Sequence, residues 1–325
     1  MNAALNGKLA TVFGGSGFLG RYVVRALAQR GWRVRAAVRR PDLAGQLQPY
    51  GAVGQIQPVQ ANLRPEFRSS VERAVEGADA VVNLVGILSE WGKQTFDAVQ
   101  TEGASVVAEA AKAAGVASLT HVSALGAEAA GASRYARSKA AGEAAIRAAF
   151  PDAVVFRPSA LFGTDDTFLN RFATLATMVP VLPLIGGGKT KFQPVYVVDV
   201  AEAIAVAIEG GATPGATYEL GGPRVMSLRE IFEFVLAETE RRRLLVPIPF
   251  ALAKLKASFL QLLPNPLLTV DQVTLLKSDS VVSEEAKAAG LTLAGLGITP
   301  HAVEAIAPSY LWTYRSRGQY DRHPA

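Results

Sequence analysis

The chain has 325 residues, half of them hydrophobic and 19% charged, with a formal net charge of +5 and a pI near 9.4. This composition permits a large core and excludes wholesale disorder. The absence of cysteine excludes disulfides, thiolate metal sites and cysteine nucleophiles, and the three scattered histidines give no reason to expect a metal. The positive charge comes without a nucleic-acid-binding motif, so we expect an anionic partner other than nucleic acid.

The start of the chain carries no recognisable targeting segment. The first strand is expected near Lys8, with neither a secretory signal nor a transit peptide before it. No uninterrupted run of about 18 apolar residues is present, so no membrane-spanning helix is expected. These features predict a bacterial cytoplasmic protein or a processed organellar form.

Short apolar strands alternate with alanine-rich helices through the first half of the chain. Strands are expected at residues 9–13, 33–38, 55–60, 80–85, 119–122 and 153–156. Helices are expected at residues 18–29, 96–114 and 135–150. Because long helices separate the strands, the pattern predicts parallel βαβ units and therefore an α/β Rossmann fold with a doubly wound parallel sheet.

The pattern loosens after about Leu161, where prolines and a run of three glycines mark loops. A strand at 195–198 and a helix at 199–209 then continue the α/β alternation. Ser227 and Glu230 have the spacing of a capping box, which predicts the start of a further helix.

These observations predict two parts. Residues 1–160 are expected to form the NAD(P)-binding Rossmann domain, and residues 161–325 a C-terminal portion. Within that portion, the segment at about 190–210 is expected to return to the Rossmann unit. The rest is expected to form a smaller α+β region on the substrate side, folded as a lid over the open end of the sheet.

Glycines at three spaced positions lie directly between the first strand and the first helix. The first glycine permits a tight turn, the second lets the backbone approach a pyrophosphate, and the third lets helix and strand pack closely. The helix N-terminus then offers N–H groups and a positive dipole end to the phosphates. The predicted cofactor contacts in this loop are Gly14, Ser16, Gly17, Phe18, Leu19 and Gly20.

The second strand ends in two arginines, Arg39 and Arg40. An NAD site usually carries an acidic residue here, which accepts a hydrogen bond from the ribose 2′-hydroxyl. Two guanidiniums suit a 2′-phosphate instead, because they offer charge and bidentate donors. The sequence therefore favours NADP(H) over NAD(H), with a solvated basic turn as the alternative.

Two further strand ends carry candidate cofactor contacts. Asn62 and Leu63 follow the third strand, where an adenine contact commonly lies. Asn83 and Gly86 end the fourth strand, where the backbone must pass close to the cofactor. For Asn83, a plain strand-end cap is the alternative.

Tyr135 and Lys139 are four residues apart, which places both on one face of a helix. A nearby ammonium lowers the pKa of a phenol, so the tyrosine can exchange a proton with a carbonyl or alcohol as hydride moves. The lysine can also reach the nicotinamide ribose. Ser123, at the end of the fifth strand, can hydrogen-bond the same substrate oxygen. The predicted catalytic residues are therefore Ser123, Tyr135 and Lys139, unless the pair only binds ribose and nicotinamide.

With these motifs the sequence resembles the short-chain dehydrogenase/reductase superfamily, in its extended or atypical branch. The likeness extends over most of the chain and includes the glycine loop, Asn83 to Gly86, Ser123, Tyr135 with Lys139, Arg157-Pro158, Leu161 to Gly163, and Pro194 to Val200. It implies that the blocks around Pro158 and Pro194 shape the nicotinamide and substrate side.

Three stretches resemble one atypical subfamily, the NADPH-binding accessory (39 kDa-type) subunit of respiratory complex I and its bacterial relatives. They are 121–126, 133–139 and a tail with motifs at 267–273, 297–300 and 310–315. The resemblance implies a mainly structural dinucleotide and a peripheral place on the cytoplasmic face of a bacterial inner membrane, or on the mitochondrial matrix side. It implies peripheral-arm partners near the quinone site. Gln100 departs from the family's asparagine, which puts a proton relay there in doubt.

The segment 241–263 is basic and apolar, and 251–263 is expected to form a helix containing Lys254 and Lys256. Such a helix is too short to span a bilayer but can lie in its interface, with the lysines near anionic head groups. An ordinary lid helix is the alternative. The resemblance favours membrane-surface contact.

The function implied is therefore an accessory or assembly subunit of NADH:ubiquinone oxidoreductase. The rival is a free-standing NADPH-dependent oxidoreductase or epimerase that uses Tyr135, Lys139 and Ser123. A sensor of the NADPH/NADP⁺ ratio is a third possibility.

Overall fold

The computed structural model describes residues 5–263 and 266–316, and its contacts divide the chain into two units. Unit 1 contains the residues up to Pro158, then Val197–Leu220 and Ser283–Thr299. Unit 2 contains Ser159–Tyr196, Gly221–Val282 and the residues from Pro300. Each unit is therefore assembled from segments far apart in the sequence.

Unit 1 is built on a seven-stranded sheet in the order β11-β6-β5-β4-β1-β2-β3, in which every pairing is parallel. The order reverses between β1 and β4, which creates a crevice at their carboxyl ends. This confirms the predicted doubly wound Rossmann sheet. The strands are β1 Leu9–Phe13, β2 Arg33–Val38, β3 Ile56–Gln60, β4 Ala80–Asn83, β5 Ser118–Val122, β6 Val154–Pro158 and β11 Thr217–Leu220.

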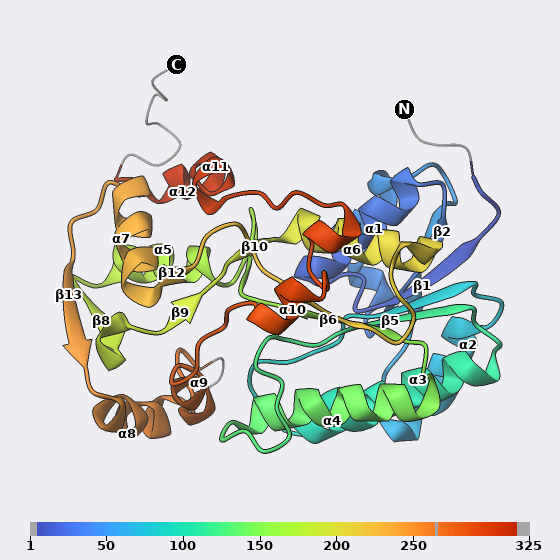
Figure 1. Cartoon of the computed structure of the whole chain (residues 1–325), viewed down its shortest axis with the longest axis horizontal. Helices are drawn as coiled ribbons and strands as arrows, with labels where there is room; N and C mark the ends of the chain where they lie inside the picture. The colour runs from blue at the N-terminus through green and yellow to red at the C-terminus, as the bar shows by residue number, and fades with distance from the viewer. Residues whose placement is uncertain (1–4, 264–265, 317–325) are drawn as a thin grey trace. The chain divides into compact units, whose positions relative to one another are not determined.

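Helices cover both faces of this sheet (Figure 1). On one face α1 packs against α6, and on the other α3 packs against α2 and α4. The helices are α1 Phe18–Gln29, α2 Arg68–Val75, α3 Gly103–Ala113, α4 Arg134–Ala149 and α6 Val197–Val206. The short α10 Glu284–Ala288 comes from the third segment of unit 1.

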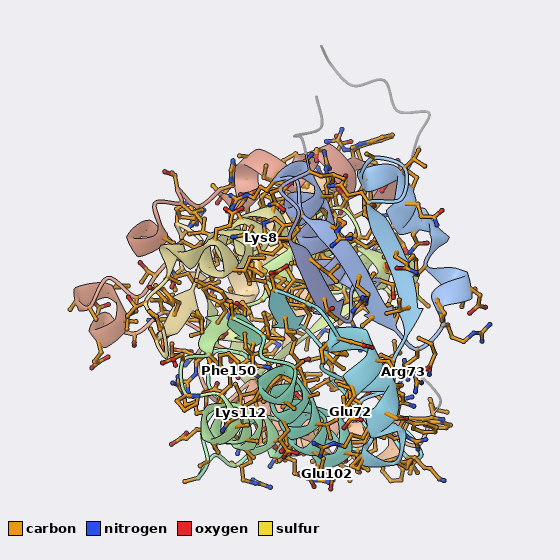
Figure 2. All side chains as sticks on the ribbon, turned by 90° about the vertical axis from the view of Figure 1, so that its right-hand side faces the viewer. Lys8, Glu72, Arg73, Glu102, Lys112 and Phe150 are labelled. Carbon is orange, nitrogen blue, oxygen red and sulfur yellow. The ribbon has the colours of Figure 1, made fainter. Side chains whose placement is uncertain are left out.

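The helices of unit 1 are amphipathic, which explains their positions. On the side of α2, α3 and α4, small and branched side chains form one buried cluster with the sheet, including Val71 and Val107. Figure 2 shows the charged side chains Glu72, Arg73 and Lys112 on the outer side of α2 and α3. The apolar stripe therefore faces the sheet and the charged stripe faces solvent.

Two helical features of unit 1 differ from the prediction. Helix α2 was not predicted, because it consists of only eight mostly polar residues, although half of them are buried. The helix predicted from residue 96 starts as a π-helix, Asp97–Glu102, before α3. A π-helical turn is typical of functional positions.

Unit 2 combines helices with three two-stranded sheets, as the predicted α+β region requires. Ser227 caps α7 and Glu230 binds back to it, which confirms the predicted capping box. The strands are β7 Leu161–Phe162, β8 Val181–Ile185, β9 Lys191–Phe192, β10 Val195–Tyr196, β12 Met226–Ser227 and β13 Leu244–Ile248. The helices are α5 Leu169–Met178, α7 Leu228–Glu238, α8 Phe250–Leu260, α9 Val270–Leu275, α11 Val303–Ile306 and α12 Pro308–Leu311.

Over residues 5–263 and 266–316, no helix combines the length and apolar character needed to cross a bilayer.

Candidate cofactor site

A cavity of about 600 Å³ opens in unit 1 at the crevice between β1 and β4. Ligands of doubly wound sheets bind at this point, outside the carboxyl ends of the strands. The segments that line the cavity follow β1, β2, β3 and β4 in turn. The lining includes Gly14, Ser16, Gly17, Arg39, Asn62, Leu63, Arg64, Gly86, Ile87, Trp91, Lys93 and Gln94.

The glycine loop brings backbone close to this cavity. Gly14 adopts a φ of +80°, which only glycine takes without strain. A Cβ on Gly20 would lie 2.1 Å from the Gly14 carbonyl oxygen, so a side chain there would collide with backbone. Gly17 is the N-cap of α1 and offers no side chain to cap it, which leaves N–H groups of the first turn for a ligand.

The structure separates the predicted loop residues into two groups. Gly14, Ser16 and Gly17 line the cavity. Phe18, Leu19 and Gly20 form the first turn of α1, and are not among the lining residues. Their contribution would come from backbone N–H groups and from the close packing of α1 on the loop.

The two predicted arginines point to different environments. Arg39 lines the cavity. Arg40 is not among the lining residues; it is exposed and paired with Asp42, with Nη2 2.7 Å from Oδ2. The hydrogen bond to Asp42 raises the pKa of Arg40. Only one residue of the predicted pair therefore lines the cavity.

Two basic residues that were not predicted also line the cavity, Arg64 and Lys93. Arg64 lies over the ring of Phe67, 5.0 Å from its centroid, and pairs with Glu66 at 3.3 Å. Its position directly after Asn62-Leu63 is a signal that could have found it. Lys93 lies in a loop without a recognisable motif.

Asn62 holds the turn after β3. Its backbone N–H donates to Ser70 Oγ at 3.0 Å, and its Oδ1 accepts from the backbone N–H of Arg64 at 3.2 Å. The first bond ties the turn to α2. Asn62 and Leu63 are thus both fixed at the cavity wall.

Asn83 organises the end of β4 from inside the unit. Its Oδ1 accepts from the backbone N–H of Val85 at 3.2 Å, which is the strand-end cap considered from the sequence. Burial lowers the pKa of His121 to about 3, so its ring is neutral and one ring nitrogen can accept a hydrogen bond. The Asn83 Nδ2 donates to His121 Nδ1 at 3.2 Å. Asn83 does not line the cavity itself, whereas Gly86 does.

Lys139 lies directly behind Gly86. Its Nζ is 3.0 Å from the point that a Cβ on Gly86 would occupy, so a side chain there would be in tight contact with the ammonium. The ammonium is buried and donates to the backbone oxygen of Val122 at 3.2 Å. Burial lowers the pKa of Lys139 to about 8, and the nearby Glu143 carboxylate opposes that shift.

Tyr135 lies one turn before Lys139 on α4, with its ring packed edge-on against Phe96. Burial raises the pKa of Tyr135 to about 12. The predicted lowering by the lysine is wrong for this structure. The ammonium lies 6.0 Å from the ring centroid of Tyr135, and desolvation of the phenolate outweighs it.

The remaining predicted residues are buried near this helix. Ser123 Oγ is buried and has no hydrogen-bond partner within the described part of the chain. Gln100 Oε1 is in the same state, while its Nε2 donates to the Ile87 oxygen at 3.3 Å. Pro158 ends β6, and its oxygen accepts from the backbone N–H of Leu125 at 3.0 Å; it does not line the cavity.

These features fit a nicotinamide dinucleotide. The glycine loop provides a cradle that side chains would fill, at the N-terminus of α1. Among the lining residues three are basic and none is acidic, which suits a ligand with several phosphates. The unpartnered Ser123 hydroxyl has hydrogen-bonding capacity left for a ligand.

Comparison with known proteins shows what the chain as a whole is similar to. Residues 10–221 match the model of the NAD dependent epimerase/dehydratase family. The chain is 37% identical to the mitochondrial NADH dehydrogenase [ubiquinone] 1 alpha subcomplex subunit 9 of Arabidopsis thaliana, over 97% of this chain and 80% of that protein. It is 36% identical to a ceramide reductase of Caulobacter vibrioides, over 63% of this chain and 62% of that protein.

The fold is shared with solved enzymes at low identity. An NADPH-dependent quinone oxidoreductase of Escherichia coli, solved with NADPH, matches with a TM-score of 0.72 and 20% identity, over 93% of this chain and 99% of that one. At this identity the likeness shows the Rossmann fold alone.

Proposed function

Because this chain belongs to the NAD dependent epimerase/dehydratase family, and within it to the alpha subcomplex subunit 9 family of NADH dehydrogenase, we propose that it is an accessory or assembly subunit of NADH:ubiquinone oxidoreductase (complex I). The likeness to the plant subunit over 97% of the chain carries this proposal. In this role the bound dinucleotide is mainly structural.

NADP(H) is the cofactor we propose, and the charge of the cavity supports it. Arg39, Arg64 and Lys93 line the cavity without an acidic neighbour in the lining, whereas an NAD site places a carboxylate at the end of β2. Arg39 would bind the 2′-phosphate. Arg40 would contribute long-range charge only, because Asp42 holds it.

The other predicted residues would hold the rest of the molecule. Gly14, Ser16, Gly17 and the first turn of α1 would bind the pyrophosphate, and Asn62 with Leu63 the adenine. Tyr135 and Lys139 would bind the nicotinamide ribose from behind Gly86. When bound, the dinucleotide supplies a hydride donor or acceptor.

The state of the Tyr135–Lys139 pair supports a structural role. A phenol with a pKa of about 12 exchanges its proton poorly near neutral pH. Binding, in contrast, needs only the hydrogen-bonding groups. Since only the folded chain binds the dinucleotide, the cofactor stabilises the subunit by mass action.

The location that we propose rests on the same family. We propose a peripheral position on the cytoplasmic face of a bacterial inner membrane, or on the matrix side if the protein is organellar. The partners would be peripheral-arm subunits near the quinone site. Segment 241–263 would lie at the membrane surface.

A reductase is the second candidate, favoured by the 36% identity with the ceramide reductase. In that case Tyr135 would be the acid/base, Lys139 would tune it and Ser123 would orient a carbonyl. The likeness covers 63% of this chain, against 97% for the complex I subunit, so it is the weaker candidate.

Native-gel separation of mildly solubilised membranes tests the proposal. The gel is probed for this chain and stained for NADH dehydrogenase activity. We expect the chain in the large active band, and loss of that band or accumulation of smaller assemblies in a deletion strain. If the chain is found only as a small species, the subunit proposal is wrong and NADPH turnover with carbonyl substrates becomes the relevant assay.

A further inference from the structure

Helix α8 of unit 2 is apolar on two opposite faces. Ala253 and Ala257 are 2% and 0% exposed and pack into the unit. Leu252, Leu255 and Phe259 are 44%, 58% and 67% exposed. Their spacing of three and four residues places them on one side of the helix, away from the buried alanines.

This outer face continues beyond the helix. Leu262 and Leu263, directly after α8, are 75% and 53% exposed. Single exposed leucines are ordinary, but five large apolar side chains within twelve residues form a patch that needs a cover. We call Leu252, Leu255, Phe259, Leu262 and Leu263 the α8 surface. Figure 1 shows α8 following β13 in this unit, beside α9.

The segment that carries the α8 surface has charges of one sign. Residues 241–270 contain three arginines and two lysines but no aspartate or glutamate. Arg241 and Arg243 donate to backbone oxygens of Tyr314 and Ala176, so they are held within the unit. Lys254 and Lys256 remain on the helix that carries the leucines, with Lys256 exposed.

We propose that the α8 surface inserts into the interface of a bilayer that contains anionic phospholipids. The leucines and Phe259 would lie among the upper acyl chains, and Lys254 and Lys256 against the head-group phosphates. The occupant is identified by complementarity: a segment that is apolar and carries only basic charges matches an anionic lipid layer. The inference deepens the peripheral position proposed above.

The sequence of α8 suits this position in a second respect. With eleven residues it is too short to cross the hydrocarbon core, so it can lie only along the surface. Anionic lipid contributes electrostatic attraction to lysines, and insertion of the apolar side chains adds to it. Binding should therefore need both the lysines and the apolar side chains.

Vesicle cosedimentation of the purified full chain tests the proposal. The vesicles are phosphatidylcholine alone, or equal parts of phosphatidylcholine and phosphatidylglycerol. We expect binding to the anionic vesicles, weakened about ten-fold or more in the double variant Leu255→Gln/Phe259→Gln. Lys254→Gln/Lys256→Gln should weaken it about ten-fold at low salt and have little effect at high salt.

Matched variants elsewhere control for general loss of apolar or basic side chains. Leu5→Gln removes a leucine that is 55% exposed in unit 1, and Lys112→Gln removes an exposed lysine of α3. Both should bind vesicles like the wild type. The thermal midpoint and the retained nucleotide of every variant should equal those of the wild type, since all four positions of α8 are outside the core.

Three outcomes would overturn the proposal. The first is that the wild type fails to bind anionic vesicles, and the second is that the α8 variants bind them as tightly as the wild type. The third is that the wild type is a dimer which the apolar double variant converts to a monomer. That result would show that a second copy of the chain covers the α8 surface. Because the assay needs no other subunit, vesicle binding without co-migration with NADH dehydrogenase would reject complex I membership alone. Co-migration without vesicle binding would reject only the lipid contact.

Discussion

The glycine loop after β1 and the inner face of α4 belong to the same unit but are constructed in different ways. The loop works through backbone: Gly14 has a positive φ, and Gly20 leaves space for the carbonyl of Gly14. The face of α4 works through buried side chains, Tyr135 and Lys139, whose pKa values of about 12 and about 8 are set by desolvation. The first region offers backbone groups that do not titrate, whereas the second offers two side chains whose protonation depends on burial.

This difference agrees with the structural role proposed for the dinucleotide. Backbone N–H groups at a helix end bind phosphate at any pH, because they do not titrate. Acid–base catalysis needs a group whose pKa lies near the working pH. Loss of that tuning leaves binding intact, and the bound cofactor then contributes to stability.

The largest effect is expected at the backbone region, from Gly20→Ala. The new Cβ would lie 2.1 Å from the Gly14 oxygen and 2.7 Å from the Gly15 carbonyl carbon, so α1 must move away from the loop. We expect a loss of about 3 kcal/mol or more in the free energy of unfolding, and purification without nucleotide. Chemical denaturation and nucleotide release on heating measure both.

Gly45→Ala is the matched control, because nothing lies within 4 Å of a Cβ at that position. Its free energy of unfolding should change by less than about 0.5 kcal/mol, and its nucleotide content should stay the same. A Gly20→Ala protein that behaves like this control would show that the close approach of helix and loop is not required.

The side-chain region predicts a pH dependence of the nucleotide-free protein. Burial lowers the pKa of Lys139 from 10.5 in the unfolded chain to about 8 in the folded chain. Between pH 8 and pH 10.5 the lysine is therefore protonated in the unfolded chain but largely neutral in the folded one. Stability should therefore rise as pH increases from about 8 towards 10.5, and below pH 8 the folded state bears the whole cost of about 3 kcal/mol.

Lys139→Met should remove this dependence. The variant loses the hydrogen bond to Val122, about 1 kcal/mol, so we expect a net gain of about 2 kcal/mol at pH 7 and no rise towards pH 10. Lys112→Met, at an exposed position of α3, should change neither value. Denaturation curves at pH 7 and pH 10 measure the free energy of unfolding of each variant. If Lys139→Met and the wild type show the same pH dependence, Lys139 is not its cause.

The sequence predicted the backbone region better than the side-chain region, for a physical reason. Strand β1 and helix α1 have the predicted bounds, because apolar alternation and glycine spacing act locally. The segment Ser283–Thr299 joins unit 1 through contacts between residues far apart in the sequence. One of them is the hydrogen bond that the Ser283 backbone N–H donates to the Glu219 carboxylate. A local sequence pattern does not contain such contacts.

The same limit applies within the candidate site. The motif gave Tyr135 and Lys139, but the direction of the tyrosine pKa depends on burial and on the 6.0 Å separation, which spacing along the chain does not contain. The paired arginines looked equivalent in sequence, and only the position of Asp42 distinguishes them. Arg64 is not part of a recognisable motif, since the charge that selects between the two cofactors is expected at the end of β2.

The two arginines give a sharper test of which groups select the cofactor. We expect Arg39→Gln to weaken NADPH binding about ten- to hundred-fold and NADH binding little, because a charge-assisted bond to the 2′-phosphate is lost. Arg40→Gln should change NADPH affinity less than about three-fold, since Arg40 is exposed and bound to Asp42. Isothermal titration with both nucleotides measures this; equal effects of the two changes would place the 2′-phosphate elsewhere.

The smallest effect is expected from Tyr135→Phe, and it separates the two roles of the fold most directly. The variant keeps the ring against Phe96 and removes only the hydroxyl, so NADPH retention and the free energy of unfolding should change by less than about 1 kcal/mol. If the pair is structural, complex I activity in cells carrying the variant equals wild type. If the protein is a reductase, the purified wild type oxidises NADPH with a carbonyl substrate and Tyr135→Phe abolishes that turnover while the nucleotide stays bound. The side-chain region would then be a working catalyst, and substrate binding would have to lower the tyrosine pKa from about 12 towards neutrality.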